Sequence, residues 1–63
     1  MREATEKRIL GALERNGITW ITINELAKKA EAHYYAILVY VAHHRNKLDR
    51  VTYGRHVYLR LKA

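Results

Sequence analysis

Residues 22 to 42 constrain the fold of this chain most, because they predict two short helices with only a brief break between them. Thr22 suits the position just before a helix, and Glu25 follows three residues later. At this spacing each side chain can bond a backbone N–H group that the first helical turn leaves unpaired. Apolar and small residues then recur at helical spacing. We therefore predict two packed helices joined by a tight turn, around which the rest of the chain is arranged.

The two predicted helices differ in how much of their surface is apolar. The first runs from Ile23 to about Ala30 and has one apolar stripe, made of Ile23, Leu26, Ala27 and Ala30. The second runs from about His33 to Lys47 and is apolar on two sides. One side holds Tyr34, Ile37, Val41, His44 and Leu48, and the other holds Tyr35, Val39, Ala42, His43 and Asn46. A helix that is apolar nearly all round is generally buried on more than one side, so its outer face should meet a partner subunit or a ligand surface.

The segment that precedes this pair predicts a helix and a short strand. Arg2 to Asn16 predicts the helix, because Thr5, Ile9, Leu10 and Leu13 recur at helical spacing. Asn16-Gly17 suits the end of this helix, since both residues tolerate left-handed backbone. Ile18 to Ile21 is β-branched and aromatic, and predicts a brief strand in which Trp20 fills the core.

From Asp49 onward apolar and polar residues alternate, which predicts a β-hairpin broken at Gly54. Cross-strand partners must share a face of the sheet, and a two-residue loop would mix apolar with polar positions. A three-residue loop, Gly54-Arg55-His56, avoids this. It pairs Tyr53 with Val57, Val51 with Leu59, and Arg50 with Arg60. Like charges that face each other across two strands are destabilising. The pairing is explained if an anion lies across the two arginines.

The length of the chain predicts a single domain over residues 1–63 with a thin core. A domain this short buries only about 60% of the surface that its unfolded chain exposes. The chain has no Cys, so neither a disulfide nor a thiolate metal site can compensate, and we expect a homodimer. The longest apolar run, Ala36 to Ala42, is far shorter than the roughly 20 residues that span a bilayer. We expect no membrane contact and a cytoplasmic location, in the host cytoplasm if the protein is viral.

The net charge of +6 is concentrated in the second half of the chain. Residues 1 to 32 carry six basic and five acidic residues, whereas residues 33 to 63 carry six basic residues against Asp49 alone. All four His also lie in the second half. This half is therefore the one expected to face an anionic partner.

The order helix, short strand, helix, helix, two-stranded wing resembles the winged helix-turn-helix family of DNA-binding domains over roughly residues 5 to 61. The resemblance is carried by the apolar and small pair Leu26-Ala27, by Ala30 and Ala32 beside the turn, and by Ile37 and Val41 at buried positions of the recognition helix. It implies an α+β winged-helix fold that binds double-stranded DNA. It also implies a transcriptional regulator of prokaryotic, archaeal or archaeal-virus type.

The chain departs from the family pattern in two places. Glu31 stands where the family usually has Gly, which predicts either a wider turn or an earlier start of the third helix. The helix face that would enter the major groove lacks the Arg and Gln that read base edges. Its Ala, Val and Tyr can instead contact thymine methyl groups, and His33 can donate to phosphate at the start of the helix.

Affinity is then expected to come mostly from basic residues through contacts with phosphates. The candidate DNA-binding residues are Lys28, Lys29, His33, Tyr35, Val39, His43, Arg45, Asn46, Lys47, Arg50, Arg55 and Arg60. For Lys28 and Lys29, a solvated helix face is an equally good explanation. The alternative function is a protein–protein interaction module whose third helix docks its apolar residues, Tyr35, Leu38, Val39 and Ala42, against a partner.

Catalysis, metal binding, cofactors and small-molecule ligands are not expected. The chain has no Ser or Cys nucleophile and no Gly-rich phosphate loop. Its four His lack the HxxxH spacing of a helical metal site, and His44 should pack at the edge of the core. Tyr34, Tyr53 and Trp20 fall on predicted inner faces, which leaves Tyr35, Tyr40 and Tyr58 as the aromatic residues that could stack on unpaired bases. Core filling by aromatic residues is the simpler explanation.

Overall fold

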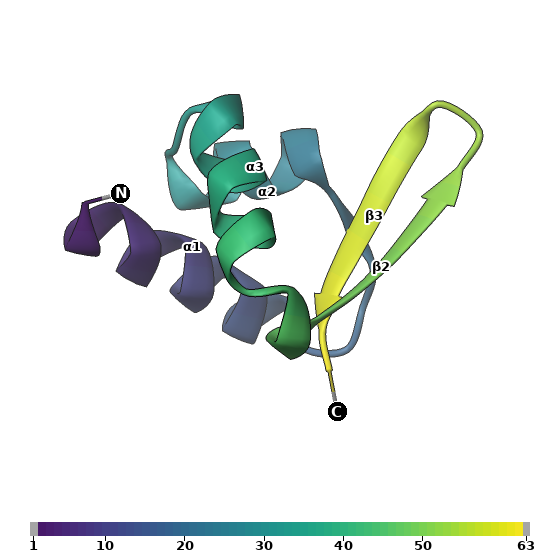
Figure 1. Ribbon diagram of the computed structural model, residues 1–63, viewed down its shortest axis with the longest axis horizontal. Helices are drawn as coiled ribbons and strands as arrows, with labels where there is room; N and C mark the ends of the chain where they lie inside the picture. Colours follow the sequence, from purple (N-terminus) through teal and green to yellow (C-terminus); the bar gives the residue numbers. More distant parts are fainter. Residues whose placement is uncertain (1, 63) are drawn as a thin grey trace.

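Three helices and a three-stranded antiparallel sheet build an α+β fold in the computed structural model, which describes residues 2–62 (Figure 1). The elements are α1 (Glu3–Asn16), β1 (Ile21–Thr22), α2 (Ile23–Ala30), α3 (Tyr34–His43), a 3-10 turn (Arg45–Lys47), β2 (Leu48–Tyr53) and β3 (His56–Leu61). In Figure 1, α3 lies in front of α2, and the β2–β3 hairpin projects away from the helices as a wing. This is the expected winged-helix layout.

The first helix has the predicted bounds to within one residue, and it ends as the sequence indicates. Arg2 occupies the N-cap position of α1 without a capping hydrogen bond from its side chain. Gly17 follows the last residue of the helix with a φ of 62°, and its N–H donates to the Glu14 carbonyl. The short strand expected over residues 18 to 21 is present, but its bounds differ, since only Ile21 and Thr22 pair with β3. The residues before them form a turn, in which the Asn16 side chain donates to the Thr19 carbonyl.

The predicted capping box starts α2. The Thr22 hydroxyl accepts from the Glu25 N–H at 3.1 Å, and the Glu25 carboxylate accepts from the Thr22 hydroxyl at 3.0 Å and from the Thr22 N–H at 3.4 Å. These hydrogen bonds favour the ionised carboxylate and lower the pKa of Glu25 below its ordinary value of 4.5. Thr22 is therefore both the last residue of β1 and the N-cap residue of α2.

Glu31 itself forms the turn between α2 and α3. It adopts left-handed backbone, with φ 51° and ψ 45°, and its N–H donates to the carbonyls of Ala27 and Lys28. The next N–H, that of Ala32, also donates to the Ala27 carbonyl. Neither a wider turn nor an earlier helix occurs, because Glu31 itself takes the left-handed conformation that ends α2, and α3 begins at Tyr34.

The third helix ends at His43, four residues before its predicted end at Lys47. A 3-10 turn follows and leads into β2, where Leu48 is buried and pairs with Leu61. The face of α3 that packs inward holds Ile37 and Tyr40, so the expected outward position of Tyr40 is wrong. Burial raises the pKa of Tyr40, and the carboxylates of Glu6 and Glu14 add to this effect.

The edge-of-core position predicted for His44 is confirmed. Its ring packs on Tyr40 with 4.2 Å between ring centroids, and its Nε2 is buried without a partner among the described residues.

The register of the hairpin differs from the prediction by one residue. The loop has two residues, Gly54 and Arg55, and it pairs Tyr53 with His56, Val51 with Tyr58, and Asp49 with Arg60. Gly54 has a φ of 62°, as a two-residue hairpin with glycine at its first central position requires. The geometry of the turn, and not the alternation of apolar residues, therefore sets the register. Arg50 pairs with Leu59 instead of Arg60.

This register gives the sheet, in the order β1-β3-β2, an inner and an outer face. The inner face packs against the helices through Ile21, Leu48 and Leu59. These join a core that also contains Ile9, Ala12, Leu13, Ile23, Leu26, Ala30, Ile37 and Tyr40. The outer face holds Val51 and Tyr53, which are 43% and 77% exposed. The expected inner positions of Tyr53 and Trp20 are thus wrong, and Tyr34 is also 43% exposed.

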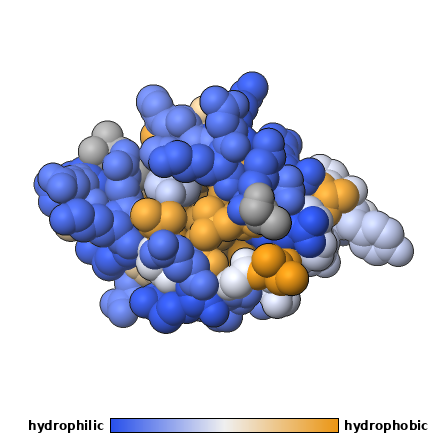
Figure 2. Space-filling model, turned by 90° about the horizontal axis from the view of Figure 1, so that it is seen from below, coloured by the Kyte–Doolittle hydropathy of each residue, from blue (hydrophilic) through white to orange (hydrophobic). Residues whose placement is uncertain are grey.

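Seen from below, apolar surface shows in the middle of the molecule between hydrophilic margins (Figure 2). On α1, Leu10 is 38% exposed and lines a shallow groove beside Tyr40 and His44. Among the described residues, no helix is long and apolar enough to cross a membrane.

Candidate nucleic-acid interface

A groove runs between α3 and the wing on the inner side of the sheet. Its deeper part encloses about 170 Å³. It is lined by Ile23, Tyr34, Leu38, Val41, Ala42, Arg45, Arg50 and Val57. A smaller hollow of about 70 Å³ shares Ile23, Tyr34 and Val57 with it and extends to Arg55 and His56 at the tip of the wing. The two hollows make one continuous surface from the end of α3 to the wing tip.

Among the described residues that line this groove, the Asp, Glu, Lys and Arg side chains are all arginines. Arg45 follows α3, Arg50 lies on the inner face of β2, and Arg55 is the second residue of the hairpin loop. No carboxylate is among the residues that line either hollow. Three guanidinium groups along one groove create a positive potential that attracts phosphate groups.

The start of α3 presents a second polar feature. The Nδ1 atom of His33 caps the helix by accepting a hydrogen bond from the Tyr35 N–H at 3.1 Å. In the neutral imidazole this places the ring proton on Nε2, which is left to donate. The His33 ring also stacks on Tyr35, with ring centroids 5.6 Å apart and an interplanar angle of 3°. A donor at a helix N-terminus is well placed for an anion.

The outer face of α3 is apolar and exposed, as the sequence predicts. Tyr35, Leu38 and Val39 are 70%, 37% and 41% exposed, and Ala42 and His43 continue the same surface. These side chains provide methyl groups and one hydroxyl but no base-reading amide or guanidinium.

Three predicted contact residues at the C-terminal side of α3 lie beyond the end of the helix, because the helix ends early, and they line one hollow together with Ala42 and His43. Arg45 lines the groove beside the wing. Lys47 lines the hollow between α1 and α3, together with Glu3 and Glu6. Asn46 belongs to the 3-10 turn and is exposed. Asn46 therefore shares a hollow with His43, but it lies in the 3-10 turn and not on the helix face that holds Val39.

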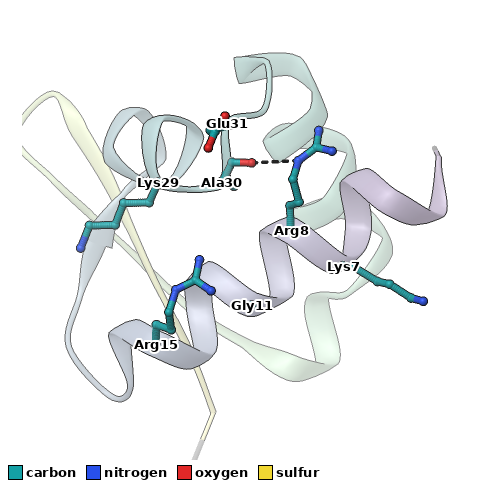
Figure 3. A pocket seen from close by; sticks show the side chains of 7 residues that line it. All are labelled: Lys7, Arg8, Gly11, Arg15, Lys29, Ala30 and Glu31. Atoms are coloured by element: carbon teal, nitrogen blue, oxygen red, sulfur yellow. Dashed lines mark hydrogen bonds between the residues drawn. The ribbon is translucent and has the colours of Figure 1, made fainter.

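The two lysines of α2 are not among the residues that line the groove. Lys29 lines a cleft between α1 and α2 together with Gly11, Arg8 and Arg15, and its side chain extends away from Arg8 (Figure 3). Its Nζ lies 3.4 Å from the Asn16 side-chain oxygen, and the Arg8 Nε donates to the Ala30 carbonyl. Lys28 is exposed on the last turn of α2.

Arg60 lies on the outer face of the sheet, across the sheet from Arg50. Its Nε donates to the Asp49 carboxylate at 3.2 Å, its guanidinium lies 4.2 Å from the centre of the Trp20 ring, and its Nη1 donates to the Ile18 carbonyl. The expected Arg50–Arg60 pair is wrong, because the two-residue loop moves each arginine to a different face.

Sequence reasoning missed Tyr34, Leu38 and Ala42 as groove residues. On the helical wheel Tyr34 falls on the core side, and nothing local indicates that the wing reaches over this part of α3. The signal that could have found the groove was the register. Pairing Asp49 with Arg60 brings opposite charges together and leaves Arg50 facing the helices.

Among the described residues, no group of three or more His, Asp or Glu side chains is arranged to hold a metal ion. Comparison with protein-family models, with curated proteins and with solved structures finds no match to this chain.

Proposed function

We propose that this protein binds double-stranded DNA and acts as a transcriptional regulator, with α3 in the major groove and the wing against the flanking phosphates. The observation that carries the proposal is the groove lined by Arg45, Arg50 and Arg55 without a carboxylate. Regulation rests on the likeness to winged-helix regulators, because the fold by itself does not assign a function.

The contacts divide into those that give affinity and those that read sequence. Arg50 and Arg55 bind phosphates from the wing, and Arg45 does so from the end of α3. His33 donates from Nε2 to a phosphate at the helix N-terminus. Tyr35 and Val39 contact thymine methyl groups, a form of readout that discriminates less strongly than a bidentate arginine. We therefore expect modest sequence preference and steep salt dependence.

The experiment is a fluorescence-anisotropy titration of a random duplex between 0.05 and about 0.2 M NaCl, a range over which phosphate contacts lose affinity steeply. Replacing Arg50 and Arg55 together by Ala should weaken binding at each salt concentration. It should also reduce the slope of log K against log [salt] by about two, since each phosphate contact contributes about 0.9.

The matched control removes two positive charges from α1 instead. Lys7 and Arg15 are exposed and lie outside the groove between α3 and the wing. Replacing both by Ala changes the net charge by the same amount, so it should leave most of the slope in place. Equal slopes for the two double variants, or no duplex binding by the wild type, would refute the proposed interface.

A second candidate function is supported by the apolar outer face of α3. Tyr35, Leu38 and Val39 form an exposed surface that could dock against another protein. A Val39→Glu variant separates the two functions: loss of partner binding with unchanged DNA affinity, at matched oligomeric state, would favour the protein-interaction module. The basic residues beside this face favour DNA as its partner over a second basic chain, because they attract phosphate and repel positive charge.

A further inference from the structure

The outer face of the sheet carries an apolar cluster that the helices leave uncovered. The outer-face cluster consists of Ile18, Trp20, Val51, Tyr53 and Tyr58. Register places Val51 beside Tyr58 in one cross-strand row. In the next row, the Arg60 side chain contacts the Trp20 ring and donates to the backbone carbonyl of Ile18. Figure 2 also shows apolar surface on the side of the molecule where the wing lies.

Local charges on this face cancel, although the chain carries a net charge of +6. The Asp49 carboxylate pairs with Arg60 at 3.2 Å, and the guanidinium of Arg60 also rests on the Trp20 ring. The groove on the other side of the sheet instead carries arginines without a carboxylate. On the outer face two basic chains therefore repel each other less than they would at the arginine-lined groove.

We infer that two copies of this chain associate face to face through the outer-face cluster. Two-fold association places Val51 and Tyr53 of one copy against the same cluster of the other. The exposed face of α3 is a poorer surface for a second copy, because Arg45 and Arg50 beside it would approach their own counterparts. The outer-face cluster leaves both α3 and the groove free for DNA.

The size of the cluster suits a small dimer interface. Ile18, Trp20, Val51 and Tyr53 are 71%, 38%, 43% and 77% exposed. Together they present about 500 Å² when large side chains carry about 150–250 Å² each. A specific interface of standard size buries about 800 Å² per partner. The cluster supplies most of this area, and the polar rim, which includes His56 and Thr22, supplies the remainder.

Protein fits this face better than unpaired nucleic-acid bases do. One side of the Trp20 ring is already covered by Arg60. Ile18 and Val51 are aliphatic and offer no ring for a base to stack on. Charge neutrality at Asp49 and Arg60 also removes the attraction for phosphate that single-strand binding requires.

The test is sedimentation equilibrium of the full chain from about 10 to 500 µM, comparing the wild type with Val51→Glu and Val39→Glu. Both valines are about equally exposed, at 43% and 41%, so neither change should unfold the chain, which circular dichroism verifies. We expect wild-type dimers of twice 7.4 kDa, at least a tenfold higher dissociation constant for Val51→Glu, and an unchanged constant for Val39→Glu. Tyr53→Ser should weaken the dimer in the same direction as Val51→Glu.

Salt separates this interface from the DNA contacts. Raising NaCl from 0.1 to 0.5 M should leave the dimer unchanged or strengthen it, because screening reduces repulsion between two basic chains, whereas duplex binding should weaken. A wild type that is monomeric throughout this range would overturn the inference, as would dissociation by Val39→Glu but not by Val51→Glu. Quenching of Trp20 fluorescence by oligothymidylate in a monomeric wild type would assign the face to unpaired bases instead.

Discussion

Replacing Glu31 by glycine is expected to stabilise the fold. Glu31 has φ 51° and ψ 45°, which is a left-handed conformation that disfavours a residue with a Cβ atom. The hydrogen bonds that it makes to Ala27 and Lys28 come from its backbone N–H, so glycine retains them. Its carboxylate is exposed at the C-terminal end of α2, where the helix dipole disfavours a negative charge.

The magnitude follows from two opposing backbone effects. Left-handed backbone destabilises an L-residue by roughly 1–2 kcal/mol, and glycine removes this strain. Glycine also gives the unfolded chain more freedom, which offsets the gain by about 0.5–1 kcal/mol. The net gain in the free energy of unfolding is about 0.5–1 kcal/mol, which corresponds to a rise in Tm of about 4–8 °C for a domain of this size.

The assay is thermal and urea unfolding followed by circular dichroism for the wild type, Glu31→Gly, Glu31→Gln and Lys28→Gly. Glu31→Gln removes the charge but keeps the left-handed strain, so it measures the electrostatic part alone. Lys28 has helical backbone within α2, and glycine there should lower stability by about 1 kcal/mol. If Glu31→Gly is no more stable than the wild type, or if Glu31→Gln gives the whole gain, left-handed strain at the turn is not the cause.

Two further predictions concern the helices. Thr22→Ala removes the capping hydroxyl of α2 and should lower the free energy of unfolding by about 1 kcal/mol at pH 7. Because the capping box lowers the pKa of Glu25 in the folded state, its stabilisation is present above pH 4.5 and is lost as the pH falls through the lowered folded value. The difference between Thr22→Ala and the wild type, measured by urea unfolding, should therefore shrink at pH 3, and an equal difference at both pH values would contradict this. Gly11→Ala in α1 should raise stability by about 0.5–1 kcal/mol, because a Cβ atom there meets only the Arg15 Nη1 at 3.6 Å. Gly17→Ala, at a φ of 62°, should instead lower stability, and gains in both variants would show that backbone conformation does not decide the sign.

The helices could be predicted from the sequence because their signals are local. The bounds of α2 coincide with the prediction, since Thr22 and Glu25 form a capping box within one helical turn. Gly17 likewise marks the end of α1. The end of α3 has no such signal, and its position depends on Leu48 entering the sheet opposite Leu61. This pairing depends on a strand that is distant in the sequence, so the residues at the end of the helix do not by themselves show where the helix stops.

Burial of the aromatic residues could not be predicted, because it depends on which elements pack against them. Tyr40 lies inside because α1 covers this side of α3, whereas Tyr53 lies outside because nothing among the described residues covers the outer face of the wing. Trp20 also lies on the outer face, where the guanidinium of Arg60 covers its ring. Periodicity assigns residues to two sides of an element, but the tertiary arrangement decides which side is buried.

The hairpin register shows how one local choice sets the distribution of charge over the whole surface. Side chains alternate along a strand, so a three-residue loop would have put Arg50 and Arg60 on the outer face and Val51 on the inner one. The Gly54-Arg55 turn instead sends Arg50 into the groove beside α3 and pairs Arg60 with Asp49 on the opposite face. One face is therefore basic and suited to phosphate, while the other is neutral and apolar and suited to a second copy. The same glycine that permits the turn thus separates the two proposed surfaces of the wing.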